Sequence, residues 1–178
     1  MTFRKGFSLL EMIIVIAIIA IIGGILAFKV PAMLHSVKVK AWNSDMATLK
    51  QALMVYATDE THGGSYPDAP SSVTDLSSWL TTNKLNAYLD KSIVDPFHKD
   101  VVVEIGPESS VVDIDGDVSG TSAQFLGYDV QDGTDVEGNP VKNGHFTLYW
   151  KVSGQEYEIS DQSGVTKVSS SSSSGSGS

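Results

Sequence analysis

The chain contains no cysteine, so no disulfide can stabilise its folded part. Basic residues are also scarce, because 12 Lys and Arg stand against 21 Asp and Glu, which gives a formal net charge of -9. A protein with this balance is a poor binder of nucleic acid by bulk electrostatics. The fold must therefore be held by an apolar core, by backbone pairing or by a bound ion, and nucleic acid is not an expected partner.

Motifs for catalysis are absent as well. The 4 histidines are scattered along the chain. The sequence has no H-E-x-x-H metal motif, no G-x-S-x-G nucleophile turn and no phosphate-binding glycine loop. We therefore expect a protein that is not an enzyme and that requires no cofactor.

What the sequence does have is one long apolar run, Met12–Phe28, without a charged residue. As a helix this run covers about 25 Å, and counted from Phe7 about 33 Å, which is enough to cross the hydrocarbon core of a bilayer. Arg4 and Lys5 precede it, so the positive-inside rule leaves the chain before the run in the cytoplasm. The sequence predicts a membrane-spanning segment over residues 7–28.

Three interpretations of this segment are open. A secretory signal predicts a small-residue cleavage site after the run, where the chain instead has Leu26-Ala27-Phe28-Lys29. A plain membrane anchor accounts for the length and the orientation but leaves Glu11 unexplained, because an isolated carboxylate in hydrocarbon costs several kcal/mol. In the third interpretation the segment is stored in the membrane, and Glu11 gains a partner in an assembly.

The residues around Glu11 carry a resemblance. The stretch Arg4-Lys5-Gly6-Phe7-Ser8-Leu9-Leu10-Glu11 combines a basic leader, glycine, phenylalanine, a hydroxyl residue, two leucines and glutamate directly before the apolar run. This pattern resembles the signal of type IV pilins and of the pseudopilins of type II secretion. The resemblance implies that a prepilin peptidase cuts between Gly6 and Phe7, and that Phe7 is then N-methylated.

The same resemblance implies a fold and a mode of assembly. The fold is an α+β pilin fold, in which a long N-terminal helix packs against a small antiparallel β-sheet head. The helix first lies in the bacterial inner membrane, and an assembly platform there then packs it into a helical homopolymer. Leu9, Leu10 and Glu11 are the expected assembly residues, and we expect the Glu11 carboxylate to pair with the Phe7 amine of a neighbouring copy. A mis-staggered copy would leave a charge unpaired, at a cost of about 3–5 kcal/mol.

The end use of such a polymer stays open at this point. One alternative is an extracellular pilus, and another is a periplasmic pseudopilus. The absence of cysteine resembles cysteine-free pilins and major pseudopilins alike, and the order of Tyr66-Pro67, a Leu-rich helix and Asp95-Pro96-Phe97 resembles major pseudopilins and related pilins, so neither feature separates the two. A third is a membrane-anchored binding domain that does not polymerise.

Sequence patterns divide the rest of the chain. We expect a cleaved leader (1–6), a stem helix (7–61), a globular head (62–168) and a flexible tail that contains only Ser and Gly (169–178). Pro31 is expected to bend the stem without ending it, and Gly23 and Gly24 to loosen it on assembly, because glycine costs about 1 kcal/mol in a helix interior.

The second half of the stem has an apolar stripe that should pack against the head. The stripe consists of Trp42, Met46, Leu49, Leu53 and Tyr56, and His62-Gly63-Gly64 should end the helix. A capping box at residues 72–75 is expected to open a short helix with Leu76, Trp79 and Leu80 on its apolar side. Strands are expected at 101–105, 110–114, 125–130, 146–152 and 157–160, in an antiparallel sheet that covers the stripe.

Two loops of the head are dense in carboxylates, the oxygen ligands that calcium prefers. The candidate calcium ligands are Asp113, Asp115 and Asp117 in the first loop and Asp132, Asp135 and Glu137 in the second. The alternative for the first loop is a hairpin turn at Asp115-Gly116, and for the second a solvated acidic loop. The resemblance to major pseudopilins implies a calcium-binding, Asp-rich loop late in the head.

Gly6 gives the first testable prediction. The mature chain should start at Phe7, with a methylated amine, and replacement of Gly6 by Leu should block cleavage because a bulky side chain obstructs the extended backbone that a peptidase must grip. Intact-protein mass spectrometry measures the mature start in assembled material and the blocked cleavage in membrane material of the variant. Retention of residues 1–6 in assembled material would contradict the prediction.

Overall fold

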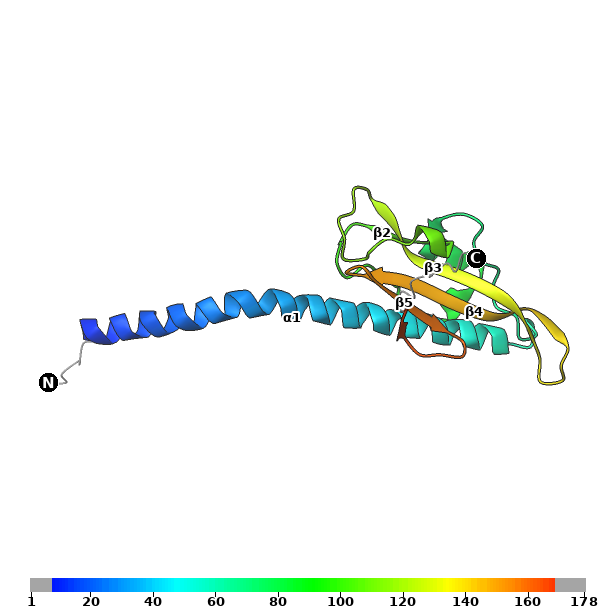
Figure 1. Ribbon diagram of the computed structural model, residues 1–178, viewed down its shortest axis with the longest axis horizontal. Coiled ribbons are helices and arrows are strands. Elements are labelled where there is room, and N and C mark those ends of the chain that lie inside the picture. Colours follow the sequence, from blue (N-terminus) through cyan, green and yellow to red (C-terminus); the bar gives the residue numbers. More distant parts are fainter. Residues whose placement is uncertain (1–7, 169–178) are drawn as a thin grey trace, which may run out of the picture. The chain divides into compact units, whose positions relative to one another are not determined.

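The computed structural model describes residues 8–168. Its contacts divide the chain into two compact units, with the division between Lys38 and Val39. Helix α1, Leu9–Thr58, contributes to both units (Figure 1). The second unit adds a β-sheet and short helices to its part of α1, so the fold is α+β, as the sequence predicts.

In the first unit, α1 is unbroken. Gly23, Gly24 and Pro31 all lie inside it, so the expected continuation past Pro31 is confirmed. A helix tolerates this proline because the apolar sequence on both sides favours helix and a single backbone donor is lost.

In the second unit, the predicted stripe of α1 is buried. Trp42, Met46, Leu49 and Leu53 have no exposed surface, and Tyr56 packs against the same core with part of its ring exposed. The helix ends at Thr58. Glycine closes the turn that follows, because Gly63 and Gly64 have φ of 57° and 84°, and the Gly64 N–H donates to the Ala57 carbonyl (3.1 Å).

The sheet has 6 strands in chain order. They are β1 (Thr74–Asp75), β2 (Val102–Gly106), β3 (Ser122–Thr134), β4 (Pro140–Val152), β5 (Gln155–Ser160) and β6 (Thr166–Lys167). Neighbours pair antiparallel, with β2 and β3 as the parallel exception. The expected antiparallel sheet is therefore mostly confirmed, and the crossover of residues 107–121 between β2 and β3 accounts for the exception.

That crossover replaces one predicted strand. Residues 110–114 were expected to form a strand, but a 3₁₀ turn, η2 (Glu108–Ser110), and an irregular segment stand there, so this prediction is wrong. One isolated bridge joins Asp113 to Lys151 of β4, and Ile114 is fully buried. Val111 and Ile114, which suggested a strand, are buried and instead anchor the crossover to the sheet.

The short helix α2 (Leu76–Thr82) begins differently from the prediction. Its N-cap is Asp75, whose carboxylate accepts hydrogen bonds from the Ser77 N–H (2.7 Å) and the Ser78 N–H (3.3 Å). The predicted capping box would have started at Ser72, which is wrong because Thr74 and Asp75 pair with β2 as strand β1 before the helix begins. Helix η1 (Leu85–Tyr88) follows α2.

Alternate residues of β4 give the sheet its two faces. Phe146, Leu148, Trp150 and Val152 are buried on the face that packs with α1, whereas Tyr149 and its neighbours on the other face are half-exposed. The Trp150 Nε1–H donates to Asn43 Oδ1 of α1 (3.1 Å), so the contact between helix and sheet includes a hydrogen bond.

The outer face of the sheet passes directly under the crossover at Gly127. A Cβ atom there would lie 3.0 Å from Glu108 Cα and from Val111 Cγ2, and 3.3 Å from Tyr149 Cβ. These neighbours are backbone or short side chains, so they have little room to move. Glycine at this position lets the crossover approach β3.

We predict that Gly127→Ala lowers the free energy of unfolding by about 1–3 kcal/mol, because an added methyl group overpacks this contact. Gly164→Ala is the matched control, since a Cβ at Gly164 meets no atom within 4 Å. Tryptophan fluorescence of the full chain in detergent against denaturant measures both variants. Equal midpoints for the two variants would contradict the prediction.

Candidate assembly surface and carboxylate loops

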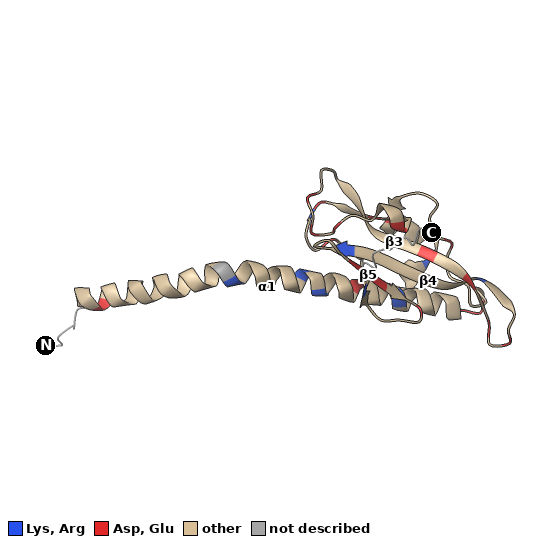
Figure 2. Cartoon of the chain, in the orientation of Figure 1, with Lys and Arg blue, Asp and Glu red and all other residues tan. Residues whose placement is uncertain are grey.

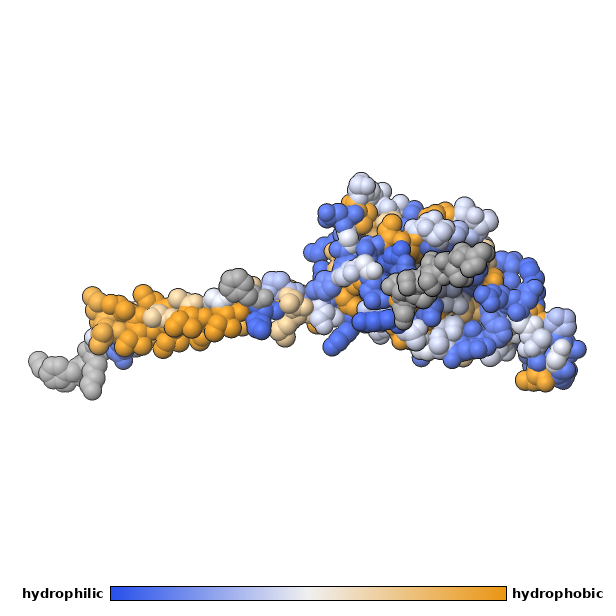
Figure 3. Space-filling model, viewed as in Figure 1, coloured by the Kyte–Doolittle hydropathy of each residue, from blue (hydrophilic) through white to orange (hydrophobic). Residues whose placement is uncertain are grey.

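The first part of α1 is an exposed apolar surface. All of its described side chains from Leu9 to Val37 are exposed in the single chain, and the surface is hydrophobic along most of this length, with charged residues at Glu11 and Lys29 (Figure 3). Among the described residues, α1 is the helix whose length and composition allow it to cross a membrane. Such a surface has to be shielded from water, either by lipid, by other helices, or first by lipid and then by helices.

Glu11 is the one acidic residue of this surface (Figure 2). It stands in the first turn of α1, where its N–H donates to the Ser8 carbonyl (3.0 Å), and Leu9 and Leu10 beside it are exposed. No Lys or His of the described part of the chain forms an ion pair with Glu11. Gly6 and Phe7 lie outside the described residues.

At Gly23 and Gly24 the helix carries no side chain, so it is thinner there than along the rest of this surface. A Cβ at either position would meet no atom within 4 Å, so neither glycine is required by a contact inside the chain. Their role must therefore come from outside the folded unit, either from close approach of another helix or from a need for a helix that loosens.

The start of the chain is similar to a known protein family. Residues 1–27 match the family described as the prokaryotic N-terminal methylation motif. This segment is the prepilin signal of type IV pilins and pseudopilins. The prepilin signal implies processing by a prepilin peptidase and pilin assembly in general, and it belongs to membrane-anchored structural precursors rather than to an enzyme family. No curated protein and no solved structure matches the chain.

The first carboxylate loop connects the crossover to the turn between β4 and β5. Asp113 Oδ1 accepts a hydrogen bond from the Gly154 N–H (2.9 Å), and Asp115 Oδ1 accepts one from the Ser153 N–H (2.7 Å). The Ser153 hydroxyl also donates to Asp115. Asp117 is exposed two residues further on. The loop turns at Gly116, as the alternative interpretation expected, but it is a turn of the crossover and has no hairpin around it.

The second loop is the tip of the β3–β4 hairpin. Asp135 Oδ1 accepts hydrogen bonds from the N–H groups of Glu137 (2.9 Å) and Asn139 (2.8 Å), and Asp135 Oδ2 accepts one from Asn139 Nδ2 (2.9 Å). The side-chain bond from Asn139, and then its backbone bond, lower the pKa of Asp135. Asp132 Oδ1 accepts from the Asn143 N–H (3.0 Å) across the hairpin.

These carboxylates therefore stabilise turns of the chain. In residues 8–168, no three His, Asp or Glu side chains lie close enough together to hold one metal ion. The sequence predicted the two carboxylate loops but not the donors that they accept from, because those donors lie in other turns of the chain. The calcium site stays a prediction.

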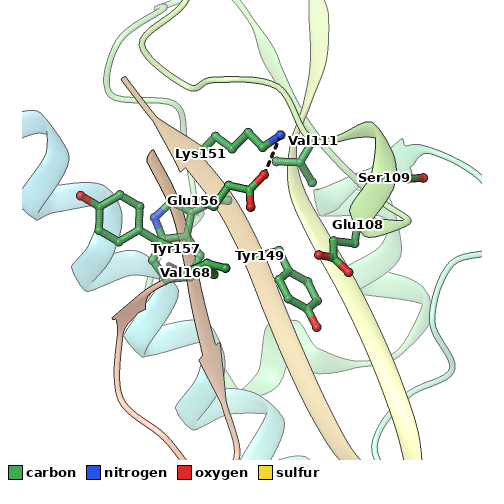
Figure 4. Close-up of a pocket in the computed structure, with 9 residues that line it drawn as sticks. Glu108, Ser109, Val111, Tyr149, Lys151, Glu156, Tyr157 and Val168 are labelled. Atoms are coloured by element: carbon green, nitrogen blue, oxygen red, sulfur yellow. Dashed lines mark ion pairs between the residues drawn. The ribbon is translucent and has the colours of Figure 1, made fainter. Parts of the chain in front are cut away.

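A pocket that the sequence did not indicate lies on the outer face of the sheet (Figure 4). It has a volume of about 350 Å³ and is lined by residues from η2, β4 and β5, among them Glu108, Tyr149 and Glu156. Lys151 Nζ lies 3.0 Å from Glu156 Oε1 at its wall. Burial raises the pKa of Tyr149. The pocket combines the Tyr149 ring with a closed ion pair, and no activated nucleophile stands among its lining residues.

A calcium-binding loop and a solvated acidic loop predict different effects of calcium on the melting temperature. If the Asp132–Glu137 loop binds calcium, then calcium at 100 times its Kd should stabilise the fold by about 2.7 kcal/mol relative to chelator. Thermal melts of the full chain in detergent measure the difference. Asp132→Asn is the control, because it keeps an acceptor for Asn143 while removing a charge, and it should abolish the gain. Equal melting temperatures with calcium and with chelator would contradict the prediction of a calcium site.

Proposed function

We propose that the chain is the structural subunit of a type IV pilus-like filament, and that it polymerises through the first part of α1 after the leader is removed. The exposed apolar surface from Leu9 to Val37 carries this proposal. The prepilin signal supports it, because that signal delivers a subunit to the membrane with its helix ready for assembly.

Lipid alone does not explain the surface. Acyl chains are as apolar as Leu and Ile, so moving such side chains from lipid to a helix bundle brings little hydrophobic gain, and association must come from close packing and polar contacts. Glu11 is the residue of this surface that is least favourable in lipid, because a carboxylate is poorly solvated in hydrocarbon. A neighbouring copy that offers a cation at its N-terminus relieves this cost and also fixes the stagger between the two helices.

The stem also needs to adapt as it moves from lipid to filament. Gly23 and Gly24 make no contact that requires them in the single chain, and Pro31 removes a backbone donor about two turns later. In this proposal the helix between Ala20 and Pro31 loosens on assembly, which lets the filament extend. Close packing of helices at the glycines is the competing explanation.

A major pseudopilin of type II secretion is the second candidate. The absence of cysteine is compatible with both candidates, because the head is held by its core and by the turn contacts of its carboxylates. The two candidates place the mature subunit differently, outside the cell in a pilus or in the periplasm in a pseudopilus. Electron microscopy of sheared surface material separates them, since long filaments containing this chain indicate a pilus, whereas their absence together with failed protein export on deletion indicates a pseudopilus.

We predict that Glu11→Leu is inserted and cleaved normally but enters filaments at least about tenfold less efficiently, because a lost pairing of 1.4 kcal/mol or more corresponds to that factor. Glu11→Asp should be partly defective, since its side chain is shorter by one methylene. The yield of sheared filament per membrane-inserted subunit measures both.

Glu60→Leu is the matched control, because Glu60 is an exposed carboxylate outside the helix surface and its loss should leave the yield unchanged. A normal yield from Glu11→Leu as the only subunit in the cell would refute the assembly role and favour a plain anchor.

A further inference from the structure

The tip of the β3–β4 hairpin presents one apolar side chain to solvent. Val136 is fully exposed, at 105% of its reference surface, between Asp135 and Glu137. Figure 1 shows the hairpin reaching past the other strands, and Figure 3 shows a hydrophobic spot at its end among hydrophilic atoms. A fully exposed valine on an acidic hairpin contributes nothing to the core of its own chain.

The tip is held in one conformation before any partner arrives. Asp135 accepts three hydrogen bonds from the residues that follow it, and Gly138 takes a φ of 86° that closes the turn. The Asp135 N–H also donates to the Asn139 carbonyl (2.9 Å). Because the backbone is already ordered, docking of this tip costs little conformational entropy.

An apolar groove lies along β2 in the same unit. It has a volume of about 290 Å³ and lies between the start of β2 and residues 92–99. Two valines in its lining are well exposed, Val94 at 63% and Val102 at 43%, and Lys99 stands at its rim in an exposed position. The groove therefore offers apolar contact together with a positive charge.

Charge limits where two copies can meet. After Lys40 the chain has 20 Asp and Glu but only 7 Lys, so two such units repel each other over most of their surface. Residues 129–139 contain four acidic residues and no basic residue, whereas residues 84–99 contain three lysines and two aspartates. The tip and the groove are thus complementary both in charge and in polarity.

The acidic side chains at the groove are already engaged. Asp75 caps α2, and Asp95 lies buried with the Phe97 N–H and His98 Nδ1 each 2.6 Å from its oxygens. Lys99 forms no ion pair with any described residue. Lys99 is therefore the charge at the rim that remains for a partner.

The tip and the groove lie at opposite ends of β3. Val102 of the groove pairs with Ser122, where β3 starts, and Val136 follows Thr134, where β3 ends, so about 40 Å of strand separates them. One copy cannot fill its own groove. A contact between the tip of one copy and the groove of the next is heterologous, and repeated it produces an open polymer rather than a closed dimer.

We propose that in the assembled polymer Val136 of one copy docks into the groove beside Val94 and Val102 of a second copy, with Glu137 facing Lys99. The inference rests on the proposed function, because its occupant is another copy of this chain. It adds the contact by which the folded units recognise each other, apart from the packing of the stems.

Disulfide cross-linking tests the contact, since the chain has no cysteine of its own. The full chain carrying Val136→Cys and Val94→Cys, as the only subunit in the cell, should form a ladder of dimers, trimers and larger species under mild oxidation. A disulfide within one copy is excluded by the distance along β3, which far exceeds the reach of the bond. The control pair is Val136→Cys with Val165→Cys, which joins the tip to an exposed valine outside the groove and should give no ladder.

Charge reversal and an assembly control complete the test. Lys99→Glu should lower the ladder yield about threefold through repulsion, and adding Glu137→Lys should restore it. Gly6→Leu should abolish the ladder together with the polymer. Polymers without a ladder, or a ladder equal to that of the control pair, would overturn this contact and leave the proposed function in place. Cross-linked dimers alone would also overturn it, because an open polymer requires a ladder, whereas correctly processed subunits that form no polymer at all would overturn both.

Discussion

Burial of one stripe of α1 against the inner face of the sheet is the contact on which the folded unit depends. Trp42 and Trp150 are both fully buried in it, and the Trp150 indole also hydrogen-bonds to Asn43. With no cysteine available, no covalent link can replace this packing. Each large apolar side chain that it buries contributes about 1.5–3 kcal/mol, so a few such residues exceed what any surface turn can supply. The helix whose first part has the length and composition to cross a membrane also completes this core with its second part.

The acidic composition has a structural use within this arrangement. Asp75, Asp113, Asp115, Asp132 and Asp135 each accept hydrogen bonds from backbone N–H groups at a cap or a turn. Ionised carboxylates are the strongest acceptors for such groups, and a head without disulfides gains fixed turns in this way. The consequence is a surface of one dominant charge, which keeps separate heads apart and restricts their contacts to places where a lysine is available.

Sequence reasoning succeeded where the physics is local and periodic. The spacing of Trp42, Met46, Leu49 and Leu53 predicted the buried stripe, and the fixed spacing from Gly6 to Glu11 predicted the prepilin signal. It failed where the answer depends on distant partners. β-branched residues at 110–114 are compatible with a strand, but strand formation requires a free neighbouring edge, and the crossover packs over the sheet instead. Likewise, nothing in the sequence shows that β2 and β3 run parallel, or that Val94 and Val102 border a groove.

Two different kinds of contact are needed to specify the proposed polymer. The charge-free run from Met12 to Ala27 is apolar around its whole circumference, so packing alone allows many rotations and many axial staggers of one helix against another. Glu11 restricts the stagger, since only some offsets bring its carboxylate to a cation, but a contact near the helix axis leaves the rotation of each subunit loosely determined. In the proposed polymer the hairpin tip and the apolar groove, some 40 Å apart along β3, would add a second contact that depends on the orientation of each subunit, because a mismatch there separates both the valine and the paired charges.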